Sequence, residues 1–81
     1  MLWMWQLEKK RPEYRFQTDE KIIADKLKRR QNFRLVGNGL NCNLWIFQTS
    51  IDRPQNARRM FKHISSGKIN YNPNEDVFLS S

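Results

Sequence analysis

The chain has little of the chemistry that builds disulfides, metal sites and membrane spans. Its 81 residues include one cysteine, Cys42, and one histidine, His63. A single cysteine cannot form a disulfide within the chain, and these two residues cannot supply the four ligands of a structural zinc site. No run approaches the ~20 apolar residues that a membrane-spanning helix needs. We therefore expect a cytoplasmic protein that uses no metal or other cofactor and has no membrane as a partner.

The sequence also lacks the residue groupings on which catalysis depends. His63 follows Lys62 and has no acidic partner at helical spacing. Nucleophilic catalysis needs a base that a third group orients, and no such arrangement is present. The segment Gly37-Asn38-Gly39 precedes a strand-like stretch, so it is typical of a turn and not of a phosphate-binding loop. We expect a protein that is not an enzyme.

What the chain does have is positive charge. Lysine and arginine number 15 against 8 aspartates and glutamates, which gives a formal net charge of +7. Such an excess favours acidic partners, either DNA or RNA or an acidic protein. The length predicts one domain over residues 1–81, with an N-terminal arm or strand at 1–12, a core at 13–72 and a C-terminal tail at 73–81.

The stretch from Leu35 to Ile51 is free of charge and has the largely apolar run Leu-Trp-Ile-Phe-Gln-Thr at residues 44–49. Alternate residues of a strand point to opposite faces, and both faces are largely apolar here. This pattern predicts a central strand that is covered on both sides. We expect Leu44 and Ile46 to lie beneath helices, and Trp45 and Phe47 to lie on the opposite face of the sheet.

Two helices are predicted by their apolar spacing and end signals. The first is expected over residues 19–31, with Thr18 as its N-cap and Asp19 and Glu20 in its first turn. The second has a start like a capping box at Asp52 and an expected stop at Gly67. Its apolar face consists of Ala57, Met60, Phe61 and Ile64.

Further strands are predicted at residues 13–17, 33–36 and 68–72, with another apolar strand or arm at 2–7. The core then has the order β-α-β-β-α-β, which resembles the ferredoxin-like split βαβ plan of the α+β class. That resemblance implies an antiparallel sheet with both helices on one face. Strands 13–17 and 44–49 would then be central. Residues 77–79 are either a docked tail or frayed.

Aromatic residues give one candidate for a binding surface. In RNA-recognition domains bases stack on aromatics of the open sheet face, where Trp45 and Phe47 are expected here. The sequence lacks the basic and Gly-aromatic spacing of those domains, however. We favour the interpretation that the N-terminal arm, with Trp3 and Trp5, covers this face, because a large exposed apolar patch is a liability.

Basic residues of the predicted helices give the other candidate. The candidate phosphate-binding residues are Lys26, Lys28, Arg29 and Arg30 on the first helix, and Arg58, Arg59 and Lys62 on the second. If the helices lie side by side, these residues would form one cationic surface suited to a nucleic-acid backbone. The alternative is a protein-interaction module, such as a small adaptor or inhibitor of the phage or mobile-element type. It rests on the apolar termini and includes a homodimer that pairs through the N-terminal strand.

Overall fold

The computed structural model describes residues 1–38, 44–65, 69–72 and 77–80. Strands and helices follow one another as β1 (Leu2–Gln6), β2 (Glu13–Thr18), α1 (Lys21–Lys28), β3 (Arg34–Asn38), β4 (Trp45–Ser50), α2 (Pro54–Ile64), β5 (Ile69–Asn72) and β6 (Val77–Ser80). The predicted α+β class and antiparallel sheet are confirmed, and every predicted strand and helix is present with modest shifts of its ends.

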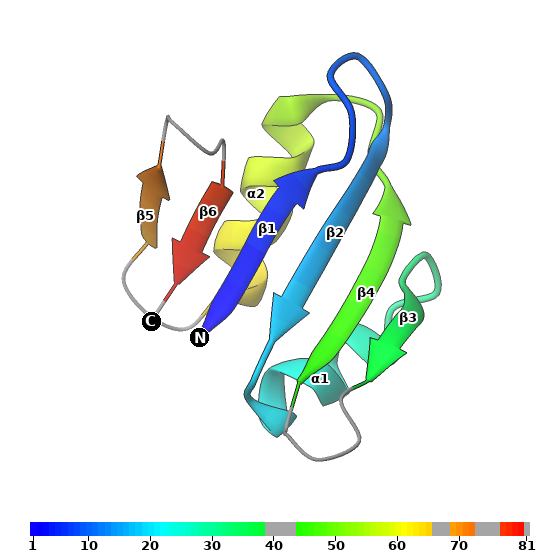
Figure 1. Ribbon diagram of the computed structural model, residues 1–81, viewed down its shortest axis with the longest axis vertical. Helices are drawn as coiled ribbons and strands as arrows, with labels where there is room; N and C mark the ends of the chain where they lie inside the picture. The colour runs from blue at the N-terminus through cyan, green and yellow to red at the C-terminus, as the bar shows by residue number, and fades with distance from the viewer. Residues whose placement is uncertain (39–43, 66–68, 73–76, 81) are drawn as a thin grey trace.

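The strands form one sheet in the order β3-β4-β2-β1-β6-β5, and every neighbouring pair is antiparallel. Its β3-β4-β2 half has the order that the ferredoxin-like plan implies. The other half differs, because the position next to β2 is occupied by β1 and not by β5 (Figure 1). Strand β6, from the expected tail, pairs with β1 and separates it from β5.

Strand β1 lies inside the sheet, and its residues alternate between the two faces. Leu2 and Met4 are buried, whereas Trp3 and Trp5 lie on the opposite face and are half-buried. The strand pairs with β2 on one side and with β6 on the other. The N-terminal segment is therefore an internal strand of the sheet, and the expectation of an arm folded across the sheet is wrong.

The buried residues of the strands and helices form one core. Residues of α1 and α2 belong to the same cluster as the buried side chains of β1, β2 and β4, and Figure 1 shows both helices behind the sheet. Four phenylalanine rings follow one another through this core. The centroid of Phe16 lies 5.0 Å from that of Phe33 and 6.5 Å from that of Phe61, which lies 5.9 Å from that of Phe78.

The faces of β4 are the reverse of what the sequence suggests. Phe47 is fully buried on the helix-covered face, and Trp45 packs against the same core. Ile46 and Gln48 point to the open face and are half-buried. Because both faces of this strand are apolar, its hydrophobic pattern does not determine which one faces the helices.

Helix α1 begins at Lys21, two residues later than expected, and no side chain caps it. Asp19 and Glu20 lie outside its first turn, where they bind the amino group of Met1 at 2.7 and 2.9 Å. The Thr18 hydroxyl accepts a hydrogen bond from the backbone N–H of Glu20 and donates one to the Met1 carbonyl. These contacts join the start of β1 to the end of β2.

Helix α2 begins with Pro54, and the N-cap is Arg53 and not Asp52. No side chain caps this end, so the predicted capping box is not formed. Ala57, Phe61 and Ile64 are buried as the apolar spacing predicts. The helix ends at Ile64, and the predicted stop at Gly67 lies outside the described residues.

Candidate nucleic-acid interface

A hollow lies between the C-terminal parts of the two helices. It has a volume of about 330 Å³ and is lined by Lys26, Arg29, Arg30, His63 and Ile64. The three cations of α1 and the following turn have the spacing i, i+3 and i+4, so they share one side of the helix. We call Lys26, Arg29 and Arg30 the cationic hollow residues.

The charges of these three residues are not neutralised by the described part of the protein. Its ion pairs join the Met1 amino group to Asp19 and to Glu20, and Arg11 to Glu8. None of them involves a cationic hollow residue, and no acidic residue lines the hollow. Cations held close together without counter-charges attract an anion from solution. The hollow therefore has the electrostatic character of a phosphate site.

The other predicted basic residues do not line this hollow. Lys28 is exposed on α1, and Arg59 and Lys62 are exposed on α2 without an ion pair to any described residue. Arg58 lies apart from them, because its guanidinium carbon is 5.9 Å from the centroid of the Phe78 ring. Such a contact between a cation and an aromatic ring is stabilising in itself. Arg58 therefore has a structural partner that the sequence did not indicate.

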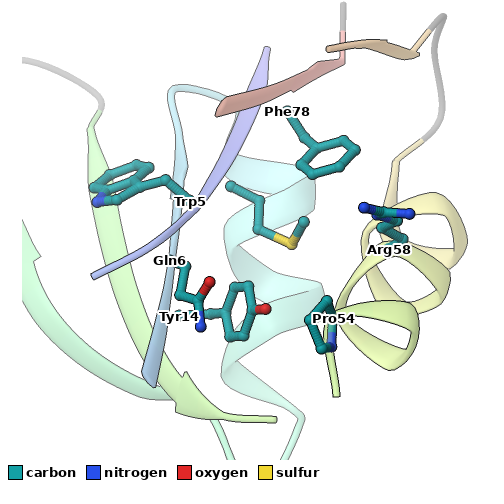
Figure 2. Close-up of a pocket in the computed structure, with 7 residues that line it drawn as sticks. Trp5, Gln6, Tyr14, Pro54, Arg58 and Phe78 are labelled. Carbon is teal, nitrogen blue, oxygen red and sulfur yellow. The ribbon is translucent and has the colours of Figure 1, made fainter. Parts of the chain in front are cut away.

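Arg58 and Phe78 border a second hollow, of about 190 Å³, between β1, β6 and the start of α2. Figure 2 shows the aromatic rings of Tyr14 and Phe78 on one side of β1, and the Trp5 indole pointing away to the other side. Gln6, Met4 and Pro54 complete the lining. The volume is small for a ligand pocket, which usually measures 300 Å³ or more.

The indole of Trp5 belongs to the open face of the sheet, where the strand pairings align it with polar residues. Across four strands the aligned positions are Arg34, Gln48, Arg15 and Trp5. The neighbouring row contains Gly37, Ile46, Gln17 and Trp3. The Arg15 Nε donates a hydrogen bond of 3.4 Å to the Gln48 side-chain oxygen. The sheet thus presents two indoles beside two arginines and two glutamines.

Sequence reasoning identified only part of this face. Trp3 and Trp5 are on it, but Trp45 and Phe47 are not, since both pack on the helix side. Arg15, Arg34 and Gln48 were not recognised as neighbours of the tryptophans, because that relationship depends on the pairing of β1 with β2 and of β2 with β4. The alternation of Tyr14 and Phe16 with Arg15 and Gln17 does indicate that Arg15 and Gln17 share one face of their strand.

No family model matches this chain, and no curated protein or solved structure is significantly similar to it. Within residues 1–38, 44–65, 69–72 and 77–80, no helix is long and apolar enough to cross a membrane. The same residues contain no cluster of three or more histidine, cysteine or acidic side chains placed to hold a metal ion. The cationic hollow and the open face of the sheet are therefore the features of this chain that bear on its function.

Proposed function

We propose that the protein binds nucleic acid, mainly through phosphate contacts made by the basic residues of its helices. The observation that supports this most directly is the group of cationic hollow residues, which line one depression that has no acidic residue in its lining. Arginine and lysine are the usual ligands of backbone phosphates, and such contacts carry no sequence information. The exposed Lys28, Arg59 and Lys62 extend the positive potential along both helices.

The formal net charge of +7 acts in the same direction at longer range. A positive field raises the rate of encounter with a polyanion, and the effect weakens as salt screens it. Charge alone would not favour one surface over another. The proximity of Lys26, Arg29 and Arg30 favours the hollow, because closely spaced cations can contact adjacent phosphates of one strand.

The test compares two triple variants with the same loss of charge. One replaces the cationic hollow residues (Lys26→Gln, Arg29→Gln, Arg30→Gln), and the other replaces exposed lysines that are not candidate contact residues (Lys9→Gln, Lys10→Gln, Lys21→Gln). Both are titrated against labelled single-stranded and double-stranded DNA and RNA at several salt concentrations. We expect the hollow variant to lose more affinity and to lower the slope of log affinity against log salt by about 2 to 3.

Equal losses in the two variants would mean that only net charge matters, and the hollow would then be rejected as the site. Absence of binding by the unaltered protein at low salt would reject nucleic acid as the partner. The alternative would then be the acidic protein partner that the same charge favours. Circular dichroism of both variants shows whether the comparison is made between folded proteins.

A further inference from the structure

We propose that the open face of the sheet binds single-stranded nucleic acid by stacking unpaired bases on Trp3 and Trp5. This inference rests on the proposed nucleic-acid binding and specifies the form of nucleic acid and a second contact surface. Both helices lie behind the sheet, and no described segment crosses its front in Figure 1. Both indoles are half-buried, so part of each remains accessible from this side.

The spacing of the two tryptophans suits bases that are spread apart. Residues i and i+2 of one strand lie about 6.6 to 6.8 Å apart on the same face. Successive bases in a stacked strand are ~3.4 Å apart. Two indoles at twice that spacing fit alternate bases of a stacked strand or neighbouring bases of an extended one. A base pair in a duplex has no free face to offer, so this arrangement favours single strands.

On the β6 side Trp3 pairs with Leu79 and Trp5 with Val77, whereas the residues on the β2 side match the polar groups of a nucleotide. Arg15 and Arg34 lie in the same row as Trp5 and form no ion pair within the described residues, so they can contact phosphates. Gln17 lies directly opposite Trp3, and Gln48 lies opposite Arg15. Amide side chains both donate and accept hydrogen bonds, as the exposed edges of unpaired bases require.

Charge also argues against a second copy of the chain as the occupant. A symmetric dimer presents the same patch on both subunits, so its arginines would face like charges across the interface. Among the described strand residues on this face, the acidic one is Glu13, at the beginning of β2. One carboxylate does not balance Arg15 and Arg34. A polyanion complements this face better.

Tryptophan fluorescence gives a direct test, since the third tryptophan lies on the other side of the sheet. Trp45 packs against the core, so a Trp45→Phe variant leaves only Trp3 and Trp5 as reporters. We expect a single-stranded oligothymidylate of about 12 nucleotides to quench this emission, and a duplex of equal length to quench it less. The converse variant, Trp3→Leu with Trp5→Leu, keeps Trp45 and should show little quenching.

Affinity measurements separate stacking from a general structural effect. Trp5→Leu should weaken binding of the single strand about 5- to 150-fold, the equivalent of ~1 to 3 kcal/mol for one lost stacking contact. Trp5→Phe keeps an aromatic face and should stay close to the unaltered protein. If Trp5→Leu does not fold, the variant Arg15→Gln with Arg34→Gln tests the same face and should also weaken single-strand binding.

Three results would overturn this inference. Unchanged single-strand affinity in folded Trp3→Leu and Trp5→Leu variants would exclude stacking. Unchanged affinity in the Arg15→Gln, Arg34→Gln variant would exclude the face as a contact surface. A concentration-dependent dimer in sedimentation, with a change in Trp3 and Trp5 emission and no nucleic acid present, would make a second copy the occupant. In the first two cases, a loss of affinity on changing the cationic hollow residues would still support the proposed function.

Discussion

Thr18 and Thr49 are buried on the same face of neighbouring strands, but among the described residues only the Thr18 hydroxyl of the two has a hydrogen-bond partner. Thr18 lies on β2 and Thr49 on β4, and their side chains are 0% and 4% exposed. The Thr18 hydroxyl is 3.0 Å from the Met1 carbonyl oxygen and 3.1 Å from the Glu20 backbone nitrogen. The Thr49 hydroxyl has no hydrogen-bond partner among the described residues. Within the part of the chain that the structure describes, the two buried threonines therefore differ in whether the hydroxyl is hydrogen bonded.

This difference predicts opposite effects of one substitution at the two sites. Valine has nearly the shape of threonine without the hydroxyl, and an unpaired buried polar group destabilises a fold by about 1 to 3 kcal/mol. Thr49→Val should raise the free energy of unfolding by about 1 kcal/mol, whereas Thr18→Val should lower it by about 1 kcal/mol. Urea denaturation measures both. A decrease for Thr49→Val would show that its hydroxyl has a partner in solution.

The amino group of Met1 makes stability depend on pH in a chain that begins with this residue. Partial burial lowers its pKa, but hydrogen bonds and charge interactions with Asp19 and Glu20 outweigh that effect, so the pKa is raised above 8.0. A raised pKa in the folded state means that the contribution to stability is complete below pH 8. It is lost as the pH rises through the higher folded-state value.

We therefore expect the free energy of unfolding to fall as the pH rises above about 8, the ordinary pKa of an α-amino group. The variant Asp19→Asn with Glu20→Gln removes both partners and should show a smaller decrease over the same range. Groups that titrate identically in the two proteins contribute equally to both pH profiles, so their contributions cancel in the difference. Parallel pH profiles of the two proteins would mean that these surface ion pairs do not contribute. High salt should reduce the difference, because both pairs are exposed.

The sequence predicted the secondary structure well because each segment carries a local signal. Period-two alternation in residues 13–17 and helical spacing from Ala57 to Ile64 correspond to β2 and α2. The order of strands is not a local property. Whether β1 or β5 lies beside β2 depends on which strand pairs more favourably, and the sequence offers apolar candidates for both positions.

The orientation of β4 was missed for a related reason. Trp45 and Phe47 alternate with Leu44 and Ile46, so hydrophobicity alone does not distinguish the faces. The next two residues do distinguish them, since Gln48 is half-exposed and Thr49 is buried. Burying a glutamine would require partners for its whole amide group, whereas threonine leaves one hydroxyl to satisfy. Weighing those two polar residues would have predicted the observed orientation.

The candidate functional residues show the same difference between local features and those that depend on strand or helix pairing. Lys26, Arg29 and Arg30 share a helix side by spacing alone, which the sequence shows. The position of His63 beside them depends on contact between the two helices. Trp5 and Arg34 are 29 positions apart along the chain and are aligned only through the pairings of β1, β2, β4 and β3. Such a surface can be recognised only once the strand order is known.

Phe61 provides the last prediction, because it connects the two halves of the core. Its ring lies between those of Phe16 on β2 and Phe78 on β6, and its side chain is 1% exposed. Phe61→Ala should lower the free energy of unfolding by about 3 to 5 kcal/mol, since it removes a large buried ring and leaves a cavity. The matched control is Ile22→Ala, because Ile22 is a large apolar residue of α1 that is 74% exposed.

Ile22→Ala should change the free energy of unfolding by no more than about 0.5 kcal/mol. Urea denaturation of both variants, followed by circular dichroism, measures the difference. A small effect for Phe61→Ala would mean that β6 and α2 do not pack through this residue. The aromatic contact between β2, α2 and β6 would then not stabilise the position of β6 beside β1, on which the observed strand order depends.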